Sequence, residues 1–158
     1  FEMVTEWGVE GVMVSPGYHF ETIPNQDLFI SRKNARKVFK NILDPVRKIR
    51  FYNNPLYLDF LRGEQEYQCT AWSNPTYTVM GWREPCYLLG DRHTQDVNDL
   101  YEDAIWEKYG VGNDPRCANC LMHCGFESAS IFSAMKSPKA AIKLIKEGAV
   151  QNSGVGAG

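Results

Sequence analysis

The runs Val9-Glu10-Gly11-Val12-Met13-Val14 and Ile49-Arg50-Phe51-Tyr52 decide the expected fold. Each is a short, apolar-rich stretch that ends at a turn signal, as a buried strand does. Between them, the segment after the N-cap candidate Ser31 repeats apolar residues at the spacing of one helix face. A strand–helix–strand order is typical of parallel α/β structure, in which the crossover is right-handed. We therefore predict two neighbouring parallel strands with the helix crossing between them.

The rest of the chain has a different pattern and predicts an α+β extension. The expected elements are a helix over residues 56–62 ended by Gly63, a hairpin of residues 69–72 with 77–82, a helix capped by Thr94, and helices over 126–136 and 138–146. The predicted organisation is therefore an α/β part over residues 1–55, a cysteine-rich extension over 56–150 and a flexible tail over 151–158.

The composition is that of a folded domain without a strong charge bias. Hydrophobic residues make up 44% of the 158 residues, and 17 Lys and Arg against 19 Asp and Glu leave a net charge of -2. This near-balance argues against a sequence-independent nucleic-acid binder, which depends on many phosphate contacts. No apolar run reaches the roughly 18–20 residues of a membrane span, and no signal peptide is recognisable, so we expect a cytoplasmic protein.

Two further expectations concern what surrounds the chain. The basic face of the helix after Ser31 is most simply a solvated face, with peripheral contact to the inner face of an anionic membrane as the alternative. The chain also opens at Phe1 as if inside a helix, so we expect it to be part of a longer polypeptide.

The cysteines are the strongest chemical signal. Three of the five lie in Cys117-Ala-Asn-Cys120-Leu-Met-His-Cys124, a spacing too close for unstrained mutual disulfides. In a reduced cytosol such thiols are more often zinc or iron–sulfur ligands, which come from a close pair and from residues distant in sequence. The predicted hairpin would bring Cys69 and Cys86 to the same side. We therefore predict one metal or cluster site built from Cys69, Cys86, Cys117, Cys120 and Cys124.

Several alternatives stay open for this site. The group bound is a [4Fe–4S] cluster or zinc, and any four of the five cysteines could be the ligands. His123, inside the triplet, is either a further ligand or, more often in such places, a hydrogen-bonding or packing residue. Cys69 or Cys86 taken alone could also be an ordinary buried thiol.

Five segments occur in an order that is specific as a set: residues 11–18 (GVMVSPGY), 56–63 (LYLDFLRG), 67–70 (YQCT), 81–89 (GWREPCYLL) and 117–127 (CANCLMHCGFE). Together they resemble the C-terminal half of the radical S-adenosylmethionine proteins of hopanoid biosynthesis, the adenosylhopane synthase type. The resemblance runs from about residue 1 to residue 146. It implies the last βα units of a partial (β/α) barrel, followed by a cysteine-rich extension.

The resemblance also implies an activity and its partners. A [4Fe–4S] cluster donates one electron, S-adenosylmethionine is cleaved, and the 5′-deoxyadenosyl radical adds to the alkene of a polycyclic triterpene such as hopene. The partners are then the N-terminal half of the same polypeptide, which binds most of the S-adenosylmethionine, and a large apolar substrate. Ser15 and Tyr18 are the residues of this chain expected to touch S-adenosylmethionine. Aromatic residues expected to wall an apolar pocket, or else to pack in the core, are Tyr18, Phe20, Phe51, Tyr52 and Tyr57.

One departure from that family limits what the chain does alone. The family holds its catalytic cluster with a Cx3Cx2C motif, whereas the triplet here has the reversed spacing Cx2Cx3C. The catalytic residues therefore stay unknown, and the isolated chain is expected to be inactive. The alternative from a different class is a non-catalytic module, stapled by zinc or an iron–sulfur cluster, that binds a partner or transfers electrons.

Overall fold

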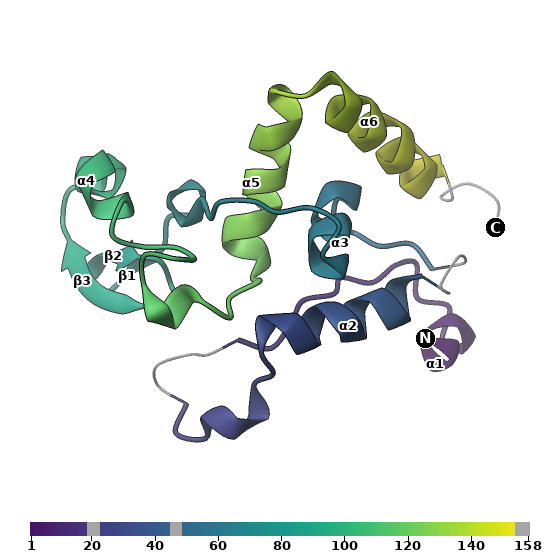
Figure 1. Ribbon diagram of the computed structural model, residues 1–158, viewed down its shortest axis with the longest axis horizontal. Coiled ribbons are helices and arrows are strands. Elements are labelled where there is room, and N and C mark those ends of the chain that lie inside the picture. The colour runs from purple at the N-terminus through teal and green to yellow at the C-terminus, as the bar shows by residue number, and fades with distance from the viewer. Residues whose placement is uncertain (19–22, 45–48, 154–158) are drawn as a thin grey trace.

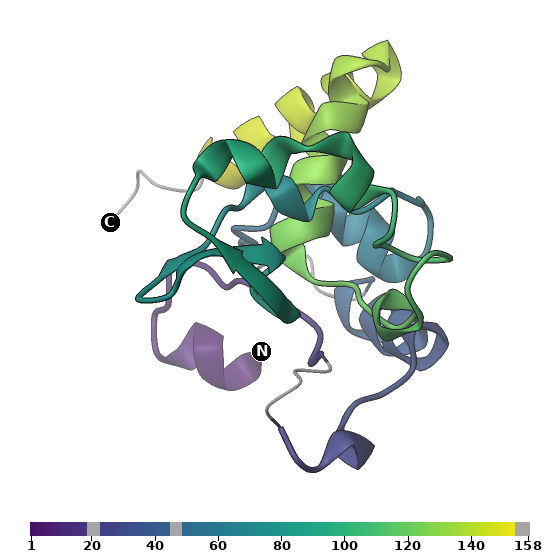
Figure 2. The same cartoon turned by 90° about the vertical axis from the view of Figure 1, so that its left-hand side faces the viewer.

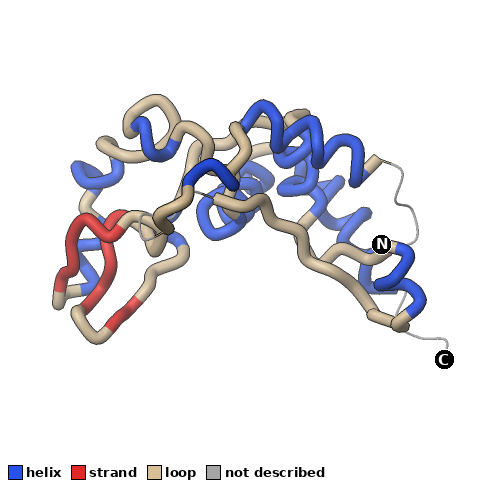
Figure 3. The backbone as a smooth tube through the Cα atoms, turned by 90° about the horizontal axis from the view of Figure 1, so that it is seen from below, coloured by secondary structure: helices blue, strands red, loops and turns tan. Residues whose placement is uncertain are grey.

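The computed structural model describes residues 1–18, 23–44 and 49–153 and shows a helical body joined to a small antiparallel sheet (Figure 1). The body consists of α2 (Arg32–Leu43), α3 (Pro55–Arg62), α5 (His123–Met135) and α6 (Pro138–Ser153). The strands β1 (Tyr77–Thr78), β2 (Gly81–Pro85) and β3 (Gly90–Thr94) gather at one end of the molecule (Figure 3). Seen from that end, they stand in front of the helical body (Figure 2).

The N-terminal segment pairs in parallel with the segment that follows α2. Helix α1 (Glu2–Glu6) is followed by Gly8, whose φ of 66° turns the chain. The N–H of Val12 donates to the carbonyl of Arg50, and the N–H of Tyr52 donates to the carbonyl of Val12, each at 2.9 Å. These bonds make a parallel bridge between Val12 and Phe51, with α2 between the two segments in sequence. The predicted parallel order is therefore confirmed.

The prediction of two full strands at this place is wrong in extent. The N–H of Val14 bonds the side-chain oxygen of Asn53 at 2.8 Å instead of continuing the backbone ladder. Val9 and Met13 are about half exposed, so only part of the first run is covered by neighbouring structure. Within the described residues the parallel pairing stops at this bridge, and they do not form a barrel. The described residues combine helices with a small three-stranded sheet, which is compatible with the coarser prediction of an α/β fold.

The main core lies where α3 meets α2 and α5. The side chain of Asn54 caps α3 by accepting from the N–H of Tyr57 at 2.9 Å, and α3 is then buried from Pro55 to Leu61. The rings of Phe60 and Phe126 stack with centroids 4.5 Å apart. The face that α2 buries is the one predicted from its spacing, with Ala35, Phe39 and Leu43. Because α3 packs against α2 and also against α5 and α6, the predicted boundary at residue 55 falls inside a continuous packing unit.

The hairpin predicted from residues 69–72 and 77–82 is wrong. Ala71–Ser73 is a 3₁₀ turn, in which the hydroxyl of Ser73 donates to the carbonyl of Thr70 at 2.6 Å. Such local hydrogen bonds compete with strand pairing. The sheet instead has the order β1-β2-β3, with Tyr77 opposite Trp82 and Arg83 opposite His93. Its strands are antiparallel, and it begins only after the segment that carries Cys69.

Three later elements are shifted from their predicted positions. Thr94 ends β3, and Asp96 rather than Thr94 caps the next turn, a 3₁₀ helix Val97–Tyr101, which leads into α4 (Asp103–Trp106). Helix α5 begins at His123, three residues before the predicted start, which places Cys124 in its first turn. Helix α6 continues to Ser153, and the rest of the predicted tail lies outside the described residues. None of the helices in the described part is long and apolar enough to cross a bilayer.

Candidate functional site

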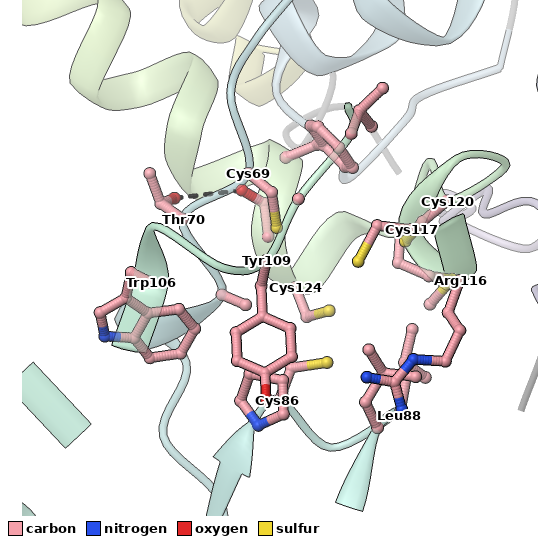
Figure 4. A pocket seen from close by; sticks show the side chains of 18 of the residues that line it. Cys69, Thr70, Cys86, Leu88, Trp106, Tyr109, Arg116, Cys117, Cys120 and Cys124 are labelled. Atoms are coloured by element: carbon pink, nitrogen blue, oxygen red, sulfur yellow. Dashed lines mark hydrogen bonds between the residues drawn. The ribbon is translucent and has the colours of Figure 1, made fainter. Parts of the chain in front are cut away.

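All five cysteines line one cavity of about 440 Å³ (Figure 4). They reach it from three parts of the chain: the segment before the 3₁₀ turn Ala71–Ser73, the turn after β2, and the region from the 3₁₀ turn Pro115–Cys117 to the first turn of α5. Every thiol is free, and Cys124 is buried while the other four are half-buried. The structure therefore brings together the five residues that the sequence singled out.

Cys69 is held against the start of α5 by its neighbours. The N–H and the hydroxyl of Thr70 both donate to the carbonyl of Gly125, at 3.0 and 3.1 Å. A Cβ atom at position 125 would lie only 2.3 Å from the sulfur of Cys69, so this close approach requires glycine there. Cys69 is thereby fixed beside the helix turn that carries Cys124.

Cys86 lies in the turn that joins β2 to β3. Pro85 and Gly90 are partners across this turn, and Leu88 and Leu89 within it are buried. The register is fixed by Glu84, which accepts two hydrogen bonds from Arg92 at 2.7 and 3.1 Å. The buried leucines hold the tip of the turn inward, so Cys86 faces the cavity.

The cysteine triplet is tied to the sheet by an ion-pair clasp. Arg116 donates two hydrogen bonds to Asp91 on β3, both at 2.7 Å, and also pairs with Asp114 at 2.7 Å. The hydroxyl of Tyr109 donates to the same Asp91 at 2.9 Å. A two-pronged guanidinium–carboxylate contact restricts geometry more than a single ion pair. It therefore holds the turn that bears Cys117 beside the strand that follows Cys86.

A second anchor connects the triplet to the helical core. The guanidinium of Arg32 donates to the carbonyl of Cys120 at 2.6 Å, and its backbone N–H donates to the side chain of Asn119 at 3.0 Å. The same guanidinium lies over the rings of Phe60 and Phe126, at 5.0 and 5.3 Å from their centroids. Cys120 is thus fixed from the N-terminal end of α2.

Burial keeps these thiols protonated in the absence of a cation. It raises the pKa of Cys120 to about 11 and that of Cys124 to about 12, and it raises the pKa of Cys69, Cys86 and Cys117 as well. Neighbouring thiolates would add to the rise in pKa at Cys69, Cys117, Cys120 and Cys124, and the carboxylate of Asp91 adds to the rise at Cys86. Nucleophilic cysteines need the opposite environment, one that lowers the pKa. The arrangement is therefore not that of a reactive thiolate, and the thiols would ionise together only around a compensating positive charge.

The spacing of the donors is wider than a single ion needs. Across residues 1–18, 23–44 and 49–153, no three His, Cys, Asp or Glu side chains converge closely enough to hold one metal ion. A tetrahedral zinc with Zn–S bonds of 2.3 Å would place its sulfur atoms about 3.8 Å apart. In an iron–sulfur cluster each thiolate binds a different iron, so the sulfur atoms stand further apart.

The other predicted site residues are divided between the cavity and its outside. Tyr18 lines the cavity and packs edge-on against Tyr87, with centroids 6.2 Å apart. Ser15 is exposed, and its hydroxyl lies 3.4 Å from Nδ1 of His123, which begins α5. His123 is therefore a hydrogen-bonding residue beside the cysteines of the triplet. The described residues that line the cavity include neither His123 nor Ser15.

Most of the aromatic residues that were predicted to line a pocket lie elsewhere in the structure. Phe51 and Tyr57 are buried in the main core, and the hydroxyl of Tyr57 donates to the carbonyl of Leu121 at 2.8 Å. Tyr52 is 51% exposed, and Phe20 lies outside the described residues. Among the described members of this set, Tyr18 alone lines the cavity, because Phe51 and Tyr57 pack in the core and Tyr52 lies at the surface.

A protein-family model matches residues 12–144, that of the family described as a domain of unknown function, DUF3463. The chain belongs to the DUF3463 family. The comparisons with curated proteins and with solved structures give no match. The DUF3463 match runs from the parallel bridge at Val12 into α6 and includes all five cysteines.

Within the DUF3463 region, several cavity residues were missed by the sequence analysis. They are Trp72, Trp106, Tyr109, Arg116 and Gly125. Gly125 and Arg116 had a usable signal, since each is the direct neighbour of a cysteine. No comparable sequence signal indicated Trp106 and Tyr109, because the segment that contains them was predicted as a helix and its continuation rather than as part of a site.

Proposed function

We propose that this chain is the cluster-carrying C-terminal part of a radical S-adenosylmethionine enzyme and that its cysteines bind an iron–sulfur cluster. The main observation in support of a bound cluster is that five free thiols line one cavity. The enzyme class rests on the resemblance of the five sequence segments to the hopanoid-biosynthesis proteins. The parallel bridge between Val12 and Phe51, with α2 between, is the connection that βα barrels repeat, and it supports a place at the end of such a barrel.

The environment of the thiols supports a bound cationic group. Several thiols that are difficult to ionise individually lie around a common space, where a positive iron core would ionise them together. Binding would then also contribute to folding, since the ligands come from segments far apart in the chain. A purely structural set of buried thiols would not need to face one cavity.

An iron–sulfur cluster is favoured over a zinc ion by the spacing. The donors among the described residues are too far apart for one ion, while the cavity has a volume of about 440 Å³. When bound, such a cluster stores or passes one electron. Because the family's catalytic cluster is held by a Cx3Cx2C motif, the cluster proposed here is a second one.

The reaction proposed for the complete polypeptide is the addition of a 5′-deoxyadenosyl group to a polycyclic triterpene. In this chain the residues that would serve it are those that exclude water, because a radical must be kept from unwanted hydrogen donors. Leu88, Leu89 and Met122 give the cavity an apolar wall, and Tyr18 borders it from the segment expected to contact S-adenosylmethionine.

Anaerobic reconstitution of the chain with ferrous iron and sulfide tests the cluster. We expect a brown protein with a broad absorption band near about 400 nm and about four iron and four sulfide per chain. The matched control replaces all five cysteines by serine and should stay colourless. A colourless wild-type chain with one zinc would favour the zinc-stapled module, and a chain that binds neither would refute the metal site.

The enzyme class has its own test in the complete polypeptide. With reductant and S-adenosylmethionine, it should release 5′-deoxyadenosine when hopene is absent and transfer the 5′-deoxyadenosyl group to hopene when hopene is present. The present chain alone should do neither, because its triplet has the spacing Cx2Cx3C. Steady release of 5′-deoxyadenosine by the present chain would contradict the proposal that the catalytic cluster is held elsewhere.

A further inference from the structure

The site has one thiol more than a cluster needs. A cluster of the [4Fe–4S] type takes four thiolates, and five free cysteines line the cavity. The surroundings of the five differ in packing and in local hydrogen bonding. These differences set Cys117 apart from the other four cysteines.

Packing separates Cys117 from the others. Cys124, which is 8% exposed, packs with Leu88 and Met122 in a small hydrophobic cluster, and Cys86 and Cys120 pack against it. Cys120 also contacts the main core, as does Cys69. Within the described residues Cys117 belongs to neither cluster. The four packed thiols are therefore held by the hydrophobic clusters, whereas Cys117 lies in the turn that the Arg116 clasp holds.

Local hydrogen bonds distinguish the same residue. The sulfur of Cys69 accepts from the backbone N–H of Ala71, two residues further along. The sulfur of Cys86 accepts from the N–H groups of Leu89 and Leu88, and the sulfur of Cys120 accepts from the N–H of Met122. Amide donors to ligand sulfur atoms are a regular means by which proteins orient and stabilise a cluster.

The two remaining thiols have donors of a different kind. The hydroxyl of Tyr87 and the N–H of Gly125 serve Cys124, which lies in the first turn of α5. Cys117 has the N–H of Gly110, from a loop seven residues earlier, and its closest charged neighbours are Asp114 and Arg116 of the clasp.

We propose that Cys69, Cys86, Cys120 and Cys124 are the cluster ligands and that Cys117 remains a free thiol beside the bound cluster. The assignment rests on the proposed function, since it presupposes that the chain binds a cluster. It changes the apparent motif: the triplet contributes the pair at positions 120 and 124, and its first cysteine is not a ligand.

Five single Cys→Ser variants, each reconstituted with iron and sulfide, test the assignment. Cys117→Ser should retain the iron, sulfide and absorption of the wild type, and each of the other four should lose at least about fivefold. Cys117→Ser is the matched control because it removes a thiol from the same cavity. If the wild type loads and Cys117→Ser does not, the assignment is wrong while the proposed function stands. If the wild type takes up no iron, both fail.

A second measurement does not depend on the folding of variants. The loaded wild-type chain is treated with N-ethylmaleimide under anaerobic conditions and analysed by peptide mass spectrometry. We expect modification at Cys117 alone, and at all five cysteines after chelation and unfolding. Protection of Cys117 together with modification of Cys69, Cys86, Cys120 or Cys124 in the loaded chain would overturn the assignment.

Discussion

Replacing Gly125 by alanine should empty the cysteine site without removing a cysteine. The added Cβ would lie 2.3 Å from the sulfur of Cys69, and ordinary contacts begin at 3.4 Å, so the sulfur must move by at least about 1.1 Å. The backbone of Ala71 lies 3.6 Å from the same point and restricts where the sulfur can go. The φ angle of Gly125 is not in the left-handed region, so the backbone itself tolerates alanine.

The expected magnitudes differ for stability and for binding. Overpacking of a filled site costs about 1–3 kcal/mol, and alanine recovers about 1 kcal/mol of helix preference in α5, so the metal-free chain should lose up to about 2 kcal/mol. Cluster content should fall more sharply, at least about fivefold, because a ligand displaced by about 1 Å no longer meets its iron. The loss should therefore exceed what the reduced stability explains.

The assay is iron and sulfide content after reconstitution, with urea unfolding of the metal-free chain beside it. Gly148→Ala in α6 is the matched control, since nothing lies within 4 Å of its added Cβ. It should bind a full cluster and gain up to about 1 kcal/mol of stability. A Gly125→Ala chain with wild-type iron and sulfide would refute the reasoning that places Cys69 among the ligands.

Three further substitutions test the scaffold by chemical unfolding. Asp59→Asn should cost about 1–3 kcal/mol, because the buried carboxylate on α3 loses its ion pair with Lys143 on α6. Tyr57→Phe should cost about 1–2 kcal/mol, since the buried carbonyl of Leu121 loses its donor. Two arginines of α2 lower the pKa of Glu66, so its contribution is present above about pH 4.3 and lost as the pH falls through the lowered pKa. Because Glu66 is 64% exposed, its substitution by Gln should cost under about 1 kcal/mol at pH 7 and nothing near pH 2. Effects at pH 2 equal to those at pH 7, or unchanged stability in the first two variants, would contradict these contacts.

Short-range signals predicted much of the fold. Ser31 caps α2 because its side chain accepts from the backbone N–H of Asn34, and Gly63 ends α3 with a positive φ, both as predicted. The parallel order around α2 followed from the alternation of elements. The sheet was misplaced because Cys69–Trp72 has strand-like composition, while hydrogen bonds at Thr70 and Ser73 hold it in a turn.

The site was predicted from the type and the clustering of its residues, and the backbone arrangement expected to unite them was not the one that the structure shows. Clustered thiols indicated one site, and the five cysteines do face one cavity, but not through the hairpin that was expected to unite Cys69 with Cys86. Cys69 arrives through its contact with Gly125, and the clasp of Arg116 with Asp91 joins residues that are far apart in sequence. Such contacts depend on tertiary packing, which no local pattern encodes.

The central claim is that the thiols around this cavity bind an iron–sulfur cluster. Mössbauer spectroscopy of the wild-type chain, reconstituted anaerobically with enriched iron and desalted, tests it most directly. The account predicts that the bound iron has the tetrahedral sulfur coordination and delocalised valence of a [4Fe–4S] cluster, and that the signal is absent from the chain with serine at all five cysteine positions. Iron that is only mononuclear, or equally abundant in the serine chain, would contradict the account.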